Sequence, residues 1–151
     1  MVNHEPIELP VPNDPLLELT GYVLQRAAST NLARLSERLA PLELRPADVA
    51  LLFLLAARPG LTQSEIGRNL DIQRANMVPL VGRLEARGLV SRKRVDGRSQ
   101  SLTLTREGRA LMAKVRKIVD SHESALLNRV PREMQPMVLP ILMALWGESP
   151  P

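Results

Sequence analysis

The sequence predicts a mainly α-helical fold with one small β-hairpin, and three observations support that prediction. Apolar residues recur at spacings of three and four along most of the 151 residues, which is the period of an amphipathic helix. One region instead alternates apolar and polar residues, and it flanks Asp96-Gly97, a pair that favours a tight hairpin turn. Thr62 followed three residues later by Glu65 is a capping box, which marks the start of a short helix before the hairpin.

Two helices are expected before that capping box. After an irregular, proline-punctuated arm at residues 1–14, the first runs over residues 15–41. Its apolar stripe extends over more than about six turns, which is typical of a helix that packs on a second subunit. The second helix, residues 46–57, begins with a proline and is apolar nearly all round, so we expect it to be buried.

The capped helix is followed by another helix after a turn at residues 71–73, and Gly88 supplies the left-handed C-cap of that second helix. Pro79 falls inside it and removes one backbone donor. Either the helix begins near Asn76, a good N-cap that would put Pro79 in the first turn, or it is kinked.

The rest of the chain is expected to form the two strands of the hairpin, a long helix capped by a threonine, and a final apolar segment that two prolines kink or divide into two short helices. These features are residues 89–95 and 100–104, the helix 105–128 after Thr105, and the segment 131–146 with Pro136 and Pro140.

Positive charge is concentrated in one third of the chain. The whole sequence has 20 Lys and Arg against 16 Asp and Glu, a net charge of +4, but residues 58–109 hold eleven basic and five acidic residues. Ten of those eleven are arginines, whose planar fork of donors suits phosphates and base edges. This pattern indicates an anionic partner such as nucleic acid, although helix surfaces are also rich in arginine for solubility alone.

Composition excludes several classes of chemistry. The chain has no cysteine and two histidines, which excludes disulfides, cysteine nucleophiles, thiolate metal sites and multi-histidine centres. Acidic pairs in a catalytic context and glycine-rich phosphate loops are absent, so we expect no enzyme, no cofactor and no metal. The longest apolar run, residues 49–57, is far shorter than the ~20 residues that span a membrane, and no signal-peptide core is present. We expect a cytoplasmic protein without a membrane partner.

The order of these elements predicts a winged helix-turn-helix at residues 46–104, with helical regions on either side of it at 15–41 and 105–147. In that fold the second helix of the pair enters the major groove, which is ~12 Å wide, while the first braces it across the backbone. An arginine at the tip of the hairpin, or wing, can reach the narrow and strongly negative minor groove.

Four segments read LTQSEIGRNL, VGRLEARGLVSR, DGR and LTLTREGRAL, at residues 61–70, 81–92, 96–98 and 102–111. Together they resemble the multiple-antibiotic-resistance regulator (MarR) family of bacterial transcription factors. The resemblance implies a single MarR-like domain over residues 15–151 that binds a pseudo-palindromic operator in double-stranded DNA. It implies a homodimer, with the dimerisation helices at residues 15–41 and 105–147. It also implies a repressor released by a small aromatic or anionic effector, and an acid at Asp96 that orients the minor-groove arginine, Arg98.

The candidate DNA-binding residues fall into three groups. Arginine and asparagine near the start of the second helix suit guanine and adenine edges, whereas Gln73 stands where the family has a Ser or Thr N-cap and caps poorly. Basic residues of the wing suit phosphates. Arg83 either touches the DNA backbone or pairs with a neighbouring acid. The full set is Gln73, Arg74, Asn76, Arg83, Arg92, Lys93, Arg94, Asp96 and Arg98.

An effector site and a second function stay open. Tyr22 and Arg26, one turn apart, would suit an acidic aromatic effector, although packing and solvation also explain them. His122 lies on an apolar stripe and is either a packed, hydrogen-bonded histidine or a pH or ligand sensor. The alternative function is a winged helix that binds proteins and does not read DNA, which Pro79 favours.

Overall fold

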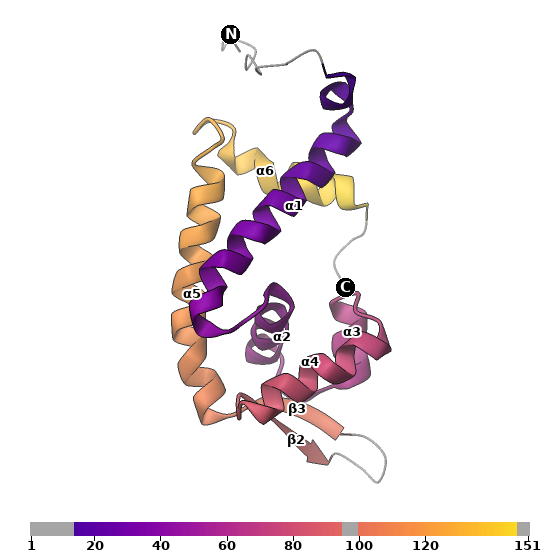
Figure 1. Cartoon of the computed structure of the whole chain (residues 1–151), viewed down its shortest axis with the longest axis vertical. Coiled ribbons are helices and arrows are strands. Elements are labelled where there is room, and N and C mark those ends of the chain that lie inside the picture. Colours follow the sequence, from indigo (N-terminus) through magenta and orange to yellow (C-terminus); the bar gives the residue numbers. More distant parts are fainter. Residues whose placement is uncertain (1–13, 95–99, 148–151) are drawn as a thin grey trace. The chain divides into compact units, whose positions relative to one another are not determined.

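The computed structural model describes residues 14–94 and 100–147, and the chain divides into two compact units, residues 1–34 and 35–151. Helices predominate and one small antiparallel sheet is present, which confirms the predicted fold class (Figure 1). The elements are α1 (Thr20–Leu39), α2 (Pro46–Ala57), β1 (Leu61–Thr62), α3 (Gln63–Asn69), α4 (Arg74–Ala86), β2 (Val90–Arg94), β3 (Gln100–Leu104), α5 (Arg106–Leu127) and α6 (Gln135–Trp146), with short 3₁₀ turns at Pro15–Glu18 and Ala40–Leu42.

The predicted first helix starts later than expected. The Asp14 carboxylate accepts a hydrogen bond of 3.0 Å from the backbone N–H of Leu16 and caps a separate 3₁₀ turn, Pro15–Glu18. Leu19 is extended, and α1 begins at Thr20. The apolar spacing did not reveal this break, because a short aspartate side chain that bonds nearby backbone competes locally with the helix.

The second unit is built around α2, which is buried as its composition predicts. Leu51 and Leu52 are fully buried and Leu55 is 1% exposed. Helix α2 contacts α4, α5 and β3, so it lies at the centre of this unit. The other fully or almost fully buried side chains of the unit are Leu39, Ile66, Met77, Val81, Leu84, Leu102 and Val115.

The predicted hairpin forms and is joined by a strand that the sequence did not predict. Strands β2 and β3 pair antiparallel from Val90 opposite Leu104 to Arg94 opposite Gln100. Strand β1 pairs with the other edge of β3, which gives the order β1-β3-β2. With only two residues, β1 is too short to show the alternation that identifies a strand.

A tight corner joins the end of α4 to β2. Gly88 has a φ of 66°, and its N–H donates to the Glu85 carbonyl at 2.8 Å, while Leu89 N–H donates to Leu84 at 2.9 Å. This is the Schellman arrangement, which confirms Gly88 as the predicted cap. The first turn of α5 packs on the same corner, where a Cβ at Gly108 would overlap the carbonyl oxygen of Leu89.

Helices α5 and α6 end the chain. Thr105 accepts a hydrogen bond of 2.9 Å from the N–H of Gly108, so the predicted cap of α5 is confirmed. Helix α6 runs unbroken through Pro140, so the expectation of two short helices is wrong. Pro136 occupies the first turn, where no donor is needed, and Pro140 leaves only one carbonyl of the helix without its backbone partner.

Replacing Gly108 with alanine should lower the free energy of unfolding by about 1–3 kcal/mol, because the added methyl group forces the α5 start away from the Leu89 carbonyl. The matched control is Gly82→Ala in α4, where a Cβ meets nothing within 4 Å. That change should raise stability by up to about 1 kcal/mol. Urea unfolding followed by circular dichroism measures both, and equal effects of the two variants would contradict the packing described here.

Candidate nucleic-acid interface

The capped helix of the predicted pair is built by reciprocal hydrogen bonds. The Thr62 hydroxyl accepts from the N–H of Glu65 at 3.3 Å, and the Glu65 carboxylate accepts from the N–H and hydroxyl of Thr62, both at 2.7 Å. The hydrogen bond from the Thr62 N–H, and to a smaller extent the one from its hydroxyl, lower the pKa of Glu65 below its ordinary value. The capping box of α3 is therefore confirmed.

Helix α3 crosses α4 closely, because a glycine lies at the contact. Gly67 is buried, and a Cβ there would lie 3.0 Å from the carbonyl oxygen of Ile72 and 3.3 Å from Met77. The turn between the helices is closed by a hydrogen bond of 2.8 Å from Ile72 N–H to the Gly67 carbonyl, with Asp71 in the left-handed region at φ 50°. These contacts fix how α4 lies on α3.

Helix α4 starts at Arg74, so the predicted start near Asn76 is wrong. Gln73 is the N-cap and makes no side-chain capping bond, which confirms that glutamine caps this helix poorly. Pro79 lies inside one continuous helix, where it removes a single backbone hydrogen bond. Four buried side chains spaced three and four apart hold the helix on the core, and they outweigh that loss: Met77, Leu80, Val81 and Leu84.

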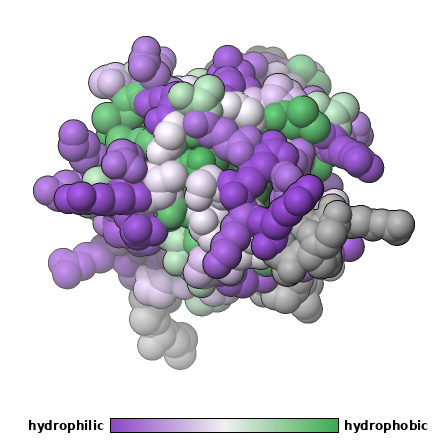
Figure 2. Space-filling view, turned by 90° about the horizontal axis from the view of Figure 1, so that it is seen from below, coloured by the Kyte–Doolittle hydropathy of each residue, from purple (hydrophilic) through white to green (hydrophobic). Residues whose placement is uncertain are grey.

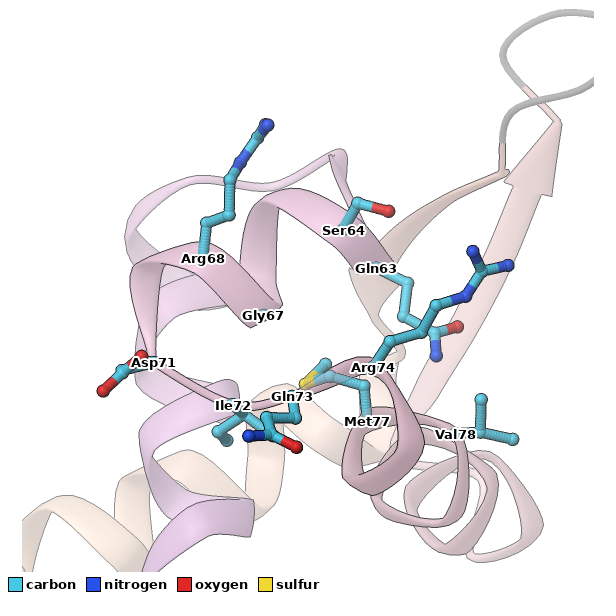
Figure 3. Close-up of a pocket in the computed structure, with 10 residues that line it drawn as sticks. All are labelled: Gln63, Ser64, Gly67, Arg68, Asp71, Ile72, Gln73, Arg74, Met77 and Val78. Carbon is cyan, nitrogen blue, oxygen red and sulfur yellow. The ribbon is translucent and has the colours of Figure 1, made fainter.

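The candidate base-reading residues occupy the exposed N-terminal end of α4. Gln73, Arg74 and Asn76 are all exposed. Figure 2 shows the face that carries α4 and the hairpin. Hydrophilic residues there surround a central area of less polar residues, which are white and green in the figure. Between α3 and α4 lies an open cavity of about 450 Å³, bordered by Arg68 on one side and Arg74 on the other (Figure 3).

Arg83 forms an ion pair with an acid 35 residues away in the sequence. Its guanidinium lies 2.8 Å from the carboxylate of Asp48, which is 3% exposed, and it also donates to the carbonyl of Pro79 at 3.3 Å. The second oxygen of Asp48 accepts from the N–H of Arg45 at 2.8 Å. Of the two alternatives for Arg83, the structure therefore shows pairing with an acid. Asp48 was not predicted as a site residue, and its only signal in the sequence is that it is a lone carboxylate in an apolar helix.

Arg92 links the wing to α4. It donates to the carboxylate of Glu85 at 2.8 Å and to the side chain of Gln100 on β3 at 3.3 Å. The bond to Glu85 raises the pKa of Arg92. Lys93 and Arg94 follow on β2 with exposed side chains. The tip candidates Asp96 and Arg98 lie outside the described residues.

The three effector candidates belong to different units. Tyr22 is half-buried and Arg26 is exposed on α1, in the unit of residues 1–34. His122 is in the unit of residues 35–151, on α5, where it is 4% exposed and has an interaction partner. Its burial agrees with the interpretation of a packed histidine.

Two other features are absent from the described part of the chain, a metal-binding cluster and a membrane-spanning helix. Among residues 14–94 and 100–147, no group of three or more His, Cys, Asp or Glu side chains is arranged to hold a metal ion. In the same residues, no helix combines the length and the apolar character needed to cross a membrane.

Comparison with known proteins places this architecture in a family. A model of the MarR family matches residues 42–99. The HTH-type transcriptional repressor Rv2887 of Mycobacterium tuberculosis is 31% identical over 117 residues, which are 76% of this chain and 84% of the relative. Its structure in complex with salicylic acid matches with a TM-score of 0.69 at 29% identity, covering 84% of this chain and 96% of that one.

The transcriptional repressor CouR is similar in both sequence and structure. Its complex with a 23-mer DNA duplex matches with a TM-score of 0.83 at 37% identity, covering 91% of this chain and 99% of that one. Its complex with p-coumaroyl-CoA matches with a TM-score of 0.81 at 36% identity, covering 92% of this chain and 99% of that one. With its capped helix pair, basic hairpin and flanking helices, the chain belongs to the MarR family of winged-helix transcriptional regulators.

Proposed function

We propose that this chain is a homodimeric repressor that binds a pseudo-palindromic operator in double-stranded DNA, works in the cytoplasm and has no enzymatic activity. The observation that supports this most strongly is the exposed N-terminal end of α4, a helix that is joined to α2 by the ion pair of Arg83 and Asp48 and is flanked by a basic wing. Residues 46–104 form the DNA-reading part, and residues 15–41 and 105–147 form the dimerisation helices.

Exposed apolar surface supports dimerisation. Helix α6 has no buried residue although most of its side chains are apolar, and a continuous exposed apolar surface is typical of one that another chain covers. In the first unit, α1 and the turn before it also expose large apolar side chains. The most exposed large apolar side chains of α6 are Leu139, Trp146 and Leu145, at 66%, 63% and 55%, and those of the first unit are Leu19 and Leu32, at 56% and 54%.

The basic residues then divide by role. We assign base contacts to Gln73, Arg74 and Asn76 and phosphate contacts to Lys93 and Arg94, because these five side chains are exposed on α4 and β2. Arg83 and Arg92 serve DNA binding by positioning α4 and the wing, since each is held by an acid of the protein. Arg98 enters the minor groove, oriented by Asp96, as in the family.

The alternative, a winged helix that binds proteins, loses its main support. It rested on Pro79 as a residue that disrupts the reading helix. Helix α4 is continuous through Pro79, and that proline lies on the exposed side of the helix. A DNA duplex is therefore the partner that the basic, exposed end of α4 suits better.

Relatives indicate the class of effector. CouR binds p-coumaroyl-CoA and Rv2887 binds salicylic acid, which share an aromatic ring and a carboxyl group, free or as a thioester. We infer that an aromatic acid or its thioester releases this repressor too, with Tyr22, Arg26 and His122 as candidate contacts.

Wild-type protein should bind a duplex from its own upstream intergenic region at nanomolar concentration. The affinity should fall steeply with salt, because the basic side chains release counterions from the DNA phosphates when the protein binds. Arg98→Ala should lower the affinity about tenfold or more, since a lost charged hydrogen bond costs about 1.5–3 kcal/mol. Fluorescence anisotropy at two salt concentrations measures this. The matched control is Arg132→Ala, another exposed arginine beyond α5. If wild type binds neither this duplex nor any sequence selected from a random library, the function proposed here is wrong.

A salt titration separates contacting from positioning arginines. Arg94→Ala should reduce the slope of log affinity against log salt by about two, one phosphate contact for each subunit. Arg83→Ala should leave that slope unchanged and lower the free energy of unfolding by about 2 kcal/mol, because it leaves the buried Asp48 carboxylate without its cation. A reduced slope in Arg83→Ala at unchanged stability would reverse the two assignments.

Addition of p-coumaroyl-CoA or salicylic acid should release the protein from its operator. Arg26→Ala should raise the concentration needed for half release at least about fivefold while leaving the effector-free affinity unchanged, because a guanidinium–carboxylate contact contributes about 1 kcal/mol or more. The control is Arg34→Ala on the same helix. Retained release in Arg26→Ala excludes Arg26 as a contact. If no aromatic acid or thioester gives release, the protein is a repressor without such an effector.

A further inference from the structure

The outward face of α4 has few groups that can hydrogen-bond to a base. At 100° per residue, the residues opposite the buried stripe are small or apolar, and all of them are exposed. Hydrogen-bonding side chains therefore stand only at the flanks of this face, and Arg83 on one flank is held by Asp48. The residues of the central line are Ala75, Pro79, Gly82 and Ala86.

Val78 is the exception among the large apolar residues of α4. Its side chain is 56% exposed, whereas the other large apolar side chains of the helix are buried. It lies one helical turn after Arg74, and the two project to the same side of α4, while Met77 turns toward α3 (Figure 3). Val78 therefore stands beside the residue that we assign to a guanine.

The major groove offers one kind of apolar group to such a side chain. Of the four bases, thymine alone carries a methyl group at the groove edge, and apolar side chains recognise it by contact. Burying one methyl group is worth roughly a fourfold change in affinity, from about 0.8 kcal/mol for each buried carbon group.

Helix geometry sets where this thymine lies. Residues one turn apart are separated by about 5.4 Å along a helix, and successive base pairs by about 3.4 Å along the duplex. A base contacted by Val78 is therefore about one or two base pairs from the guanine contacted by Arg74.

We propose that Val78 is a specificity-determining residue that reads the 5-methyl group of a thymine in each operator half-site, about one or two base pairs from the guanine that Arg74 reads. The inference rests on the proposed function, because it requires α4 to lie in the major groove.

The test replaces thymines one at a time by deoxyuridine, which lacks the methyl group and keeps the same hydrogen-bonding edge. The probe is a fluorescein-labelled duplex recovered from a random library by wild-type protein. Wild type should lose about fourfold in affinity at one thymine of a half-site, and about fifteenfold when both half-sites are substituted. Val78→Ala should bind the thymine and deoxyuridine duplexes equally.

Two variants serve as controls. Val78→Ile retains an apolar side chain and should keep the thymine-to-deoxyuridine ratio of wild type. Arg74→Ala should weaken binding to both duplexes and also keep that ratio, because it removes the neighbouring contact only. Since Val78 is exposed, its substitutions leave the core intact, and circular dichroism with thermal unfolding verifies this.

Three results overturn the proposal while leaving DNA binding in place. In the first, the recovered site has no thymine within about two base pairs of the guanine at which Arg74→Ala loses discrimination. In the second, no deoxyuridine substitution changes the affinity of wild type. In the third, Val78→Ala keeps the thymine-to-deoxyuridine affinity ratio of wild type. Failure of wild type to bind any duplex is a different result, because it removes the proposed function and this inference together.

Discussion

The ion pair between Asp48 and Arg83 is the contact on which the geometry of the DNA-reading part depends most. Asp48 is a carboxylate in the most apolar helix of the chain, and a buried carboxylate is unfavourable unless it is paired and hydrogen-bonded. Arg83 supplies the charge from α4 and the N–H of Arg45 satisfies the other oxygen. The pair adds a directional contact between α2 and α4 to the apolar burial of both helices. The start of α2 and the last turn of α4 are therefore joined at a defined point.

Much of the positive charge in residues 58–109 is used inside the protein. Arg87 donates to the carbonyls of Leu42 and Glu43, at 2.9 and 2.7 Å, and thereby ties the end of α4 to the turn before α2. Arg109 donates to the Leu104 carbonyl at 2.8 Å and ties α5 to β3. Because guanidinium groups satisfy several acceptors at once, they suit such corners as well as they suit phosphates. Net charge therefore overstates the number of arginines available to DNA.

The sequence predicts most of the fold because its signals are local. Thr62 and Thr105 cap helices and Gly88 ends one, and each acts through bonds to residues a few positions away. The start of α4 was not predictable in this way, since the burial of its apolar side chains outweighs the proline penalty there. Helix α6 also continues through its proline, and no buried residue of that helix explains it. For the site, exposed candidates such as Arg74 were identifiable by residue type. The role of Arg83 was not, because its partner Asp48 is distant in sequence and only the fold brings the two together.

The same corner that ends α4 also starts α5, and this constrains how the DNA-reading part can respond to change elsewhere. Thr105 donates to the Gly88 carbonyl at 2.6 Å, and the α5 backbone at Gly108 lies against Leu89. Helix α5 then continues unbroken to Leu127, and His122 is buried about 24 Å from its start. If one end of a rigid helix reorients, the contacts that hold its other end must also change. The corner contains both the last turn of α4 and the residue before the wing, so the start of α5 is joined to both elements that we propose to contact DNA.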